Sequence, residues 1–164
     1  MGVSGSGKST IARTLAKRLR FAFIDGDALH SPANVEKMSH GHALSDDDRG
    51  PWLHLIGQQM KDAASHPRGC VVACSALERQ YRDILRQYVP ETFFIVLEGT
   101  YALIHARIEA RPHEFMPTSL LASQFAILEP LQSDEHGMSV DIQSTPQEIV
   151  DQIEAALGDG VERP

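Results

Sequence analysis

Short apolar runs alternate with amphipathic segments along the chain. The apolar runs are rich in β-branched and aromatic residues, and they predict strands at 21–25, 70–75, 93–97 and 138–142. The segments between them repeat apolar residues every three or four positions, which predicts helices at 9–20, 78–87, 101–111 and 118–128. Continuous apolar strands that alternate with helices predict an α/β fold, in which a parallel sheet is covered by helices on both faces.

Three further helices are predicted from side chains that are typical N-caps. Ser31 precedes a proline and predicts a short helix that stops at Gly41. Ser45 precedes three aspartates and predicts a helix to about residue 64. Thr145 with Glu148 has the capping-box pattern and predicts a last helix to about residue 157. Because ligands bind beyond the carboxyl ends of parallel strands, functional residues are expected just after the strands.

Composition narrows the class of protein. The chain has 164 residues, 42% of them hydrophobic and 23% charged, which predicts one globular domain. No apolar run approaches the roughly 18 residues of a membrane span, and the N-terminus lacks a signal-peptide pattern. The net charge of −7 disfavours a non-specific nucleic-acid binder but leaves room for a small cationic pocket. Cys70 and Cys74 are expected as buried thiols of a reducing compartment, which predicts a cytoplasmic protein.

The first residues carry a strong chemical signal. The stretch from Gly2 to Ser9 fits the phosphate-loop pattern G-x-x-x-x-G-K-[ST]. Glycines let backbone N–H groups converge on phosphate oxygens, and the following helix adds the positive end of its dipole. Lys8 is expected to reach the β- and γ-phosphates of ATP and to act in catalysis, and the Ser9 hydroxyl to ligate Mg²⁺. The predicted ATP-binding residues of this loop are Gly2, Val3, Ser4, Gly5, Ser6, Gly7, Lys8, Ser9 and Thr10.

A pair of carboxylates follows the first predicted strand. Asp25 and Asp27 flank a glycine at the strand end that lies on the same edge of the sheet as the phosphate loop. Two such carboxylates can divide the chemistry of phosphoryl transfer. We expect Asp25 to support Mg²⁺ and Asp27 to accept the proton of an attacking hydroxyl. The alternative for an Asp-Gly-Asp sequence is an ordinary turn.

Cationic and polar residues farther along are candidates for holding an acceptor and the transferred phosphate. His30 and Lys37 lie on a short predicted helix, and Arg49 could grip a substrate carboxylate at two points. Arg107 and Arg111 share one helical face next to a predicted lid at about 108–120, where arginines would stabilise phosphoryl charge. We expect a single P-loop domain over 1–164, with an acceptor-binding segment at about 28–64.

Several stretches beyond the phosphate loop form specific motifs. They are Asp25-Gly26-Asp27 with His30, Asn34 and Lys37, then Asp46-Asp47-Asp48-Arg49 before Pro51-Trp52-Leu53, Ala73-Cys74-Ser75-Ala76-Leu77 before Tyr81-Arg82-Asp83, Phe115-Met116-Pro117, and Ser123-Gln124-Phe125 before Leu128-Glu129-Pro130. In these motifs, which extend over most of its length, the chain resembles bacterial gluconokinases, small P-loop kinases related to shikimate and adenylate kinases. The resemblance implies ATP-dependent phosphorylation of the 6-hydroxyl of D-gluconate, and a homodimer. Ser75, Arg79 and Arg82 are further candidates for substrate binding.

Two positions depart from the pattern of that family. Glu78 stands where the family usually has lysine, and Glu114 stands where its lid usually has a histidine, with His113 shifted by one residue. Two other functions remain open on the sequence. One is a related kinase for shikimate or a nucleoside monophosphate, although a shikimate site typically has three glycines at the position of Cys74-Ser75-Ala76. The other is a non-catalytic ATP-binding module.

The strand that leads into the phosphate loop is the last expectation from the sequence. In a P-loop fold this strand lies at the centre of the sheet, and here only Met1 precedes the loop. A strand of this kind needs about five to seven apolar residues. The sequence therefore predicts that the natural protein begins upstream of Met1.

Overall fold

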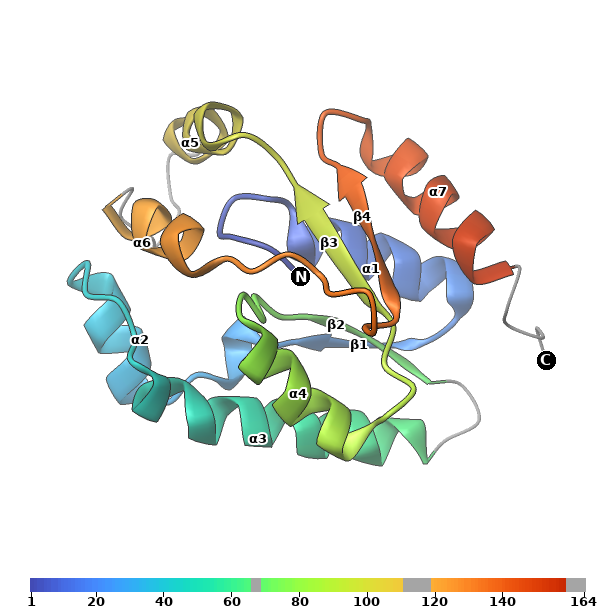
Figure 1. Ribbon diagram of the computed structural model, residues 1–164, viewed down its shortest axis with the longest axis horizontal. Helices are drawn as coiled ribbons and strands as arrows, with labels where there is room; N and C mark the ends of the chain where they lie inside the picture. Colours follow the sequence, from blue (N-terminus) through green and yellow to red (C-terminus); the bar gives the residue numbers. More distant parts are fainter. Residues whose placement is uncertain (66–68, 111–118, 159–164) are drawn as a thin grey trace.

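The structure is a computed structural model, and it describes residues 1–65, 69–110 and 119–158. Helices and strands alternate along the chain, as Figure 1 shows. In chain order the elements are α1 (Lys8–Leu19), β1 (Ala22–Asp25), the 3-10 helix η1 (Asp27–Leu29), α2 (Pro32–Ser39), α3 (Asp46–Ala64), β2 (Cys70–Ala73), α4 (Arg79–Tyr88), β3 (Phe94–Glu98), α5 (Tyr101–Glu109), α6 (Ser119–Ile127), β4 (Gly137–Asp141) and α7 (Pro146–Gly158). The predicted α/β fold and each predicted strand and helix are confirmed, with ends that shift by at most two residues.

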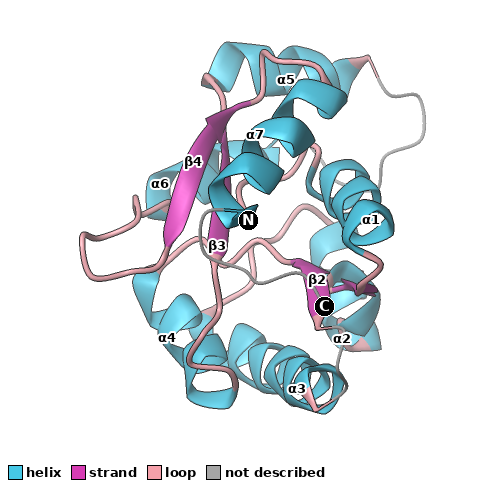
Figure 2. Cartoon of the chain, turned by 90° about the vertical axis from the view of Figure 1, so that its right-hand side faces the viewer, coloured by secondary structure: helices cyan, strands magenta, loops and turns pink. Residues whose placement is uncertain are grey.

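The strands are parallel, as predicted, and within the described residues they form two separate pairs. β1 pairs with β2, with Asp25 opposite Ala73, and β3 pairs with β4, with Leu97 opposite Val140. Figure 2 shows the β3–β4 pair set apart from the β1–β2 pair. All four strands run in the direction that brings their carboxyl ends toward the phosphate loop, which lies between the two pairs.

The backbone of Met1 and Gly2 connects the two pairs of strands. The Met1 ammonium donates a hydrogen bond to the Ile95 carbonyl of β3, and the Leu97 N–H donates to the Met1 carbonyl at 2.9 Å. The Gly2 N–H donates to the carbonyl of Ser75, just after β2, at 3.1 Å. The phosphate loop therefore starts from a point that is held by strands on both sides.

Two clusters of apolar side chains make the core. One lies among α1, α5, α7, β3 and β4 and includes Leu15, Ile104 and Val150, and the other lies among α3, α4 and β2 and includes Leu53 and Ile56. A cavity of about 310 Å³ lies between β2 and β3, with a lining that is mostly apolar. Helices α1 and α3 lie on opposite sides of the β1–β2 pair (Figure 1), so the predicted covering of the strands by helices is confirmed.

The helix starts follow the local signals in the sequence. The Ser31 side chain accepts the Asn34 N–H at the start of α2. Ser45 and Asp48 form a capping box at the start of α3, and Thr145 and Glu148 form the corresponding pair at α7. These caps satisfy backbone donors that would otherwise lack a partner.

Candidate active site

The phosphate loop has the backbone shape that its glycines predict. Gly5 and Gly7 have φ angles of 77° and 95°, a left-handed conformation that favours glycine. A Cβ at Gly5 would also lie 2.6 Å from Cγ1 of Ile108, so α5 packs directly on the loop. Helix α1 begins at Lys8, so the positive end of its dipole faces the loop, and its first turn has no acidic residue that would offset it.

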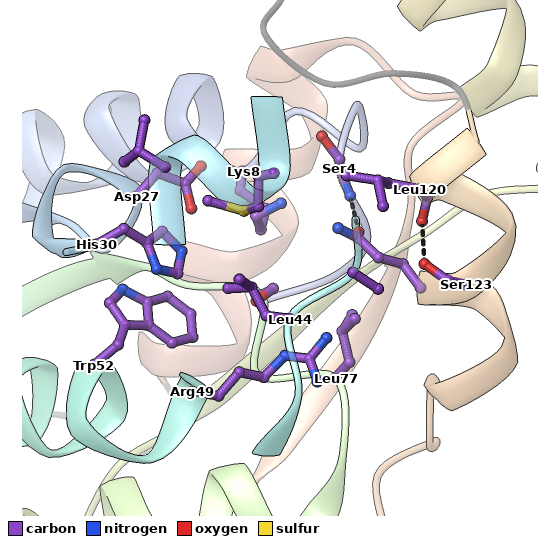
Figure 3. A pocket seen from close by; sticks show the side chains of 15 residues that line it. Ser4, Lys8, Asp27, His30, Leu44, Arg49, Trp52, Leu77, Leu120 and Ser123 are labelled. Atoms are coloured by element: carbon purple, nitrogen blue, oxygen red, sulfur yellow. Dashed lines mark hydrogen bonds between the residues drawn. The ribbon is translucent and has the colours of Figure 1, made fainter. Parts of the chain in front are cut away.

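A pocket of about 310 Å³ opens next to this loop. Its lining includes six residues that the sequence analysis proposed for the site, Ser4, Lys8, Asp27, His30, Arg49 and Ser75. Figure 3 shows Lys8 and Ser4 on one side of the pocket, Asp27 and His30 on another, and Arg49 below them. These residues come from the phosphate loop, the segment after β1, helix α3 and the segment after β2.

Lys8 and Arg49 are the two cations that line the pocket among the described residues. The Lys8 ammonium donates to the Val3 carbonyl at 3.0 Å, which folds the side chain back over the phosphate loop. The Arg49 side chain is 15% exposed, and its guanidinium lies over the Tyr81 ring at 5.4 Å from the centroid. Two cations on one pocket favour an anionic ligand.

The two carboxylates after β1 face different neighbours. Asp27 lines the pocket, whereas Oδ2 of Asp25 accepts a hydrogen bond from Arg13 at 3.1 Å. The other oxygen of Asp25 is buried and has no hydrogen-bond partner in the described part of the chain. Gly26 between them approaches β2 closely, since its N–H donates to the Ala73 carbonyl at 2.8 Å and a Cβ would lie 2.6 Å from that oxygen. The two carboxylates on either side of this glycine therefore lie in different surroundings.

One wall of the pocket is a stacked pair of rings. The His30 and Trp52 rings lie 4.2 Å apart at an angle of 14°, and the Trp52 N–H donates to the Gly26 carbonyl at 2.7 Å. Burial lowers the pKa of His30, with Asp27 opposing the shift and Arg49 adding to it. The His30 imidazole is therefore neutral at neutral pH. Trp52 is buried and also lines the pocket.

Several predicted site residues lie away from the pocket. Lys37 forms an ion pair with Asp48, and Arg79 donates to both oxygens of Asp134 at 2.7 and 2.6 Å. Arg107 donates to the Ile142 carbonyl at 2.7 Å. Ser9 and Thr10 lie in the first turn of α1 and do not line the pocket. Arg111 and the lid residues 111–118 lie outside the described residues.

The structure corrects the proposal that Arg82 binds substrate. Its side chain is fully buried and pairs with the equally buried carboxylate of Glu135 through two hydrogen bonds of 2.6 and 2.8 Å. The remaining guanidinium hydrogens go to the carbonyls of Leu77, Glu129 and Pro130. All five donors are used, so Arg82 holds the segment after α6 against α4.

Helix α6 adds residues that the sequence analysis did not assign to the site. Leu120, Ser123 and Gln124 line the pocket, and Oε1 of Gln124 accepts the Ser4 N–H of the phosphate loop at 2.6 Å. Their spacing of three and four residues puts them on one helical face, which is a signal the sequence contains. Tyr81 of α4 was also missed, although its hydroxyl contacts Arg49.

Within residues 1–65, 69–110 and 119–158, no three His, Cys, Asp or Glu side chains are grouped so that they could hold a metal ion. Mg²⁺ in phosphoryl transfer is usually bound by one or two protein oxygens together with the phosphates, so a preformed cage is not required. No helix in the same ranges is long and apolar enough to span a membrane.

Comparisons with known proteins agree with this geometry. A family model described as "AAA domain" matches residues 1–131. The thermosensitive gluconokinase of Escherichia coli K12 is 42% identical over 96% of this chain and 84% of its own length, and the gluconokinase of Gluconobacter oxydans is 42% identical over 93% and 86%. The crystal structure of a gluconokinase from Sinorhizobium meliloti has a TM-score of 0.87 and 42% identity, over 97% of this chain and 89% of its own.

More distant structures share the fold alone. The APS kinase CysC of Mycobacterium tuberculosis has a TM-score of 0.66 at 20% identity, over 96% of this chain and 94% of its own. Because the gluconokinases match at about twice that identity over nearly the whole chain, they define its relationship more closely. The phosphate loop, the pocket beside it and these relatives together show that this chain belongs to the gluconokinase family of P-loop kinases.

Proposed function

We propose that this chain is an enzyme that transfers the γ-phosphoryl group of ATP to the 6-hydroxyl of D-gluconate. The observation that carries the proposal is the pocket in which the phosphate loop, a carboxylate and an arginine face one cavity. Phosphoryl transfer needs these three parts, namely a phosphate cradle, a group that receives the hydroxyl proton and a group that holds the acceptor. The gluconokinase relatives identify the acceptor.

Each lining residue has a role in this proposal. Lys8 neutralises charge on the β- and γ-phosphates, and the backbone N–H groups of the loop surround their oxygens. Asp27 accepts the proton of the attacking hydroxyl. Arg49 binds the gluconate carboxylate, while His30 and Ser75 provide hydrogen-bonding groups for the acceptor hydroxyls. The segment 28–64 thereby forms the acceptor side of the pocket.

A magnesium ion fits the residues beside the phosphate loop. We propose that Ser9 and Asp25 hold it, because the buried Asp25 oxygen that lacks a protein partner is available to a cation or its water. The ion supplies neutralisation of phosphate charge when it is bound. Arg107 and Arg111, at the base of the lid segment 108–120, are proposed to contact the nucleotide once it is in place.

We also propose that the chain works as a homodimer in the cytoplasm. The two free cysteines fit a reducing compartment, which also supplies ATP. Light scattering during size-exclusion chromatography would measure the mass in solution, and a monomer of 18.1 kDa would contradict the dimer.

A coupled assay of ADP release tests the proposed reaction. The purified chain is given ATP and Mg²⁺ with D-gluconate, shikimate, other sugar acids or nucleoside monophosphates in separate reactions. We expect the highest kcat/KM with D-gluconate and 6-phosphogluconate as the product in mass spectrometry. A higher kcat/KM with shikimate or a nucleotide would show that D-gluconate is not the acceptor. ATP binding without any turnover would contradict the kinase proposal.

A further inference from the structure

Tyr81 is a buried tyrosine whose hydroxyl meets three charged side chains. The residue lies on α4 and is 3% exposed. Its hydroxyl oxygen is 2.6 Å from Oδ1 of Asp46 and 2.7 Å from Oε1 of Glu78. The same oxygen accepts a hydrogen bond from Nη1 of Arg49 at 3.1 Å. A phenol has one hydrogen to donate, so it binds one carboxylate at a time while its lone pairs remain for the guanidinium.

The phenol is the hydrogen-bond partner of Arg49, whereas the nearby Asp46 forms a longer ion pair with it. Nη1 of Arg49 lies 3.8 Å from Oδ1 of Asp46, which is longer than a hydrogen bond. Among the described residues, the Tyr81 oxygen is the hydrogen-bond acceptor of the Arg49 guanidinium. A direct bidentate pair with a carboxylate would occupy the two-point face of the guanidinium. Contact through the phenol fixes one nitrogen and leaves the rest of the group for a ligand in the pocket.

Burial and hydrogen bonding keep the Tyr81 hydroxyl protonated. Burial raises the pKa of Tyr81 well above its usual range, and the hydrogen bonds to Asp46 and Glu78 act in the same direction. The hydroxyl therefore keeps its hydrogen throughout the neutral range. The two carboxylates come from different elements, α3 and the residue before α4, so either one can hold the hydroxyl when the other turns away.

We propose that Tyr81 is a positioning residue for acceptor recognition, which holds the Arg49 guanidinium at the pocket wall where it binds the carboxylate of a sugar acid. The inference rests on the proposed function, because it needs an acceptor with a carboxylate. Tyr81 itself does not line the pocket, so its effect passes through Arg49.

The test compares Tyr81→Phe with the unchanged chain in steady-state kinetics. Phenylalanine keeps the buried ring and removes the hydroxyl, so the loss of one hydrogen bond to a charged group should raise the KM for gluconate by about tenfold. The KM for ATP and the kcat at saturating gluconate should stay within about twofold, because the guanidinium binds the acceptor in ground and transition states alike. Tyr88→Phe is the matched control, since Tyr88 lies on the same helix and its hydroxyl contacts His54 instead.

A double-mutant cycle separates positioning from a general structural effect. In the Arg49→Ala background, Tyr81→Phe should not change the KM for gluconate further. If Tyr81→Phe fails to fold in a thermal melt, Asp46→Ala combined with Glu78→Ala removes both acceptors of the hydroxyl and should raise the same KM more than either change alone. An unchanged gluconate KM, an equal rise in the Arg49→Ala background or an equal rise in the ATP KM overturns the inference. No activity of the unchanged chain with gluconate overturns the proposed function instead.

Discussion

Replacing Arg82 by methionine should lower the stability of the fold and leave the KM for gluconate nearly unchanged. Arg82 and Glu135 are both fully buried, and two guanidinium hydrogen bonds go to that carboxylate. Three more go to backbone carbonyls, at 3.3, 3.2 and 3.2 Å. Methionine keeps an apolar stem of similar length but donates no hydrogen bond, so it leaves a buried carboxylate and buried carbonyls without their donor.

The size of the effect follows from the buried ion pair. Removing one partner of such a pair costs about 3–5 kcal/mol, out of the roughly 5–15 kcal/mol that holds a domain folded. In a chain of this length each kcal/mol lowers the melting temperature by about 2–4 °C, which gives a fall of about 6–20 °C. The Leu77 carbonyl still accepts the Glu129 N–H at 2.9 Å, so most of the loss comes from Glu135.

Lowering the pH should reduce the difference in stability between Arg82→Met and the unchanged chain. In the unchanged chain Arg82 lowers the pKa of Glu135, so this carboxylate stabilises the fold above its unfolded pKa of 4.5, and the gain is lost as the pH falls through the lower folded pKa. In Arg82→Met the buried carboxyl keeps the Gln132 N–H but loses the guanidinium, so burial raises its pKa relative to the unchanged chain. The variant therefore takes up a proton on folding as the pH falls, which relieves part of its penalty.

The assay combines thermal melting by circular dichroism with gluconate kinetics well below the melting temperature. Arg86→Met is the control, because Arg86 lies on the same helix and pairs with Asp83, and both side chains are partly exposed. A partly exposed pair of this kind contributes much less than a fully buried one, about 1 kcal/mol. A melting temperature of Arg82→Met close to that of Arg86→Met, together with a raised gluconate KM, would refute the structural role and return Arg82 to substrate binding.

Four further changes test the pocket. Lys8→Met should lower kcat by about 10³ or more with an unaltered melting curve, and near-normal turnover in the ADP-release assay would contradict the phosphate-loop assignment. Asp27→Asn should remove most of kcat while calorimetry shows little change in ATP affinity, whereas loss of ATP binding would place Asp27 at the metal. Arg49→Lys should raise the KM for gluconate, because an ammonium cannot bind a carboxylate at two points as a guanidinium does. An unchanged KM would show that another residue binds the gluconate carboxylate. Because the folded pKa of His30 is lowered, its contribution to stability is complete above the unfolded pKa of about 6.5 and is lost as the pH falls. The urea midpoint should therefore fall less steeply with acid in His30→Gln, and parallel curves would contradict this.

The elements and the phosphate loop could be predicted because their signals are local. A capping residue such as Ser45 contacts a backbone N–H three residues away, and the loop glycines set their own φ angles. The position of Asp25 and Asp27 at the carboxyl end of β1 could also be predicted, since both lie within two residues of the end of that strand. Such short-range patterns predict the folded structure because the local preference and the tertiary contacts favour the same conformation.

The arginines show where such prediction ends. Arg49, Arg79 and Arg82 all follow strands or begin helices near the predicted site, and nothing in their neighbourhood distinguishes them. Their bonding partners distinguish them, and these partners lie far along the chain. Arg79 binds Asp134 and Arg82 binds Glu135, which are 55 and 53 residues away. Because the segment that carries both acids packs against α4 only in the folded chain, the sequence could not assign the three side chains to different roles.

The charges of the chain are distributed so that an acidic protein keeps a cationic pocket. The net charge is −7, and some cations outside the pocket are paired with acidic side chains, as Lys37 is with Asp48 and Arg79 is with Asp134. In the pocket, Lys8 donates to the Val3 carbonyl and Arg49 donates to the Tyr81 hydroxyl, with Asp46 3.8 Å from Arg49. Since a local field decides binding more than the net charge does, the two anionic substrates meet positive charge where the phosphate loop and the acceptor wall face each other.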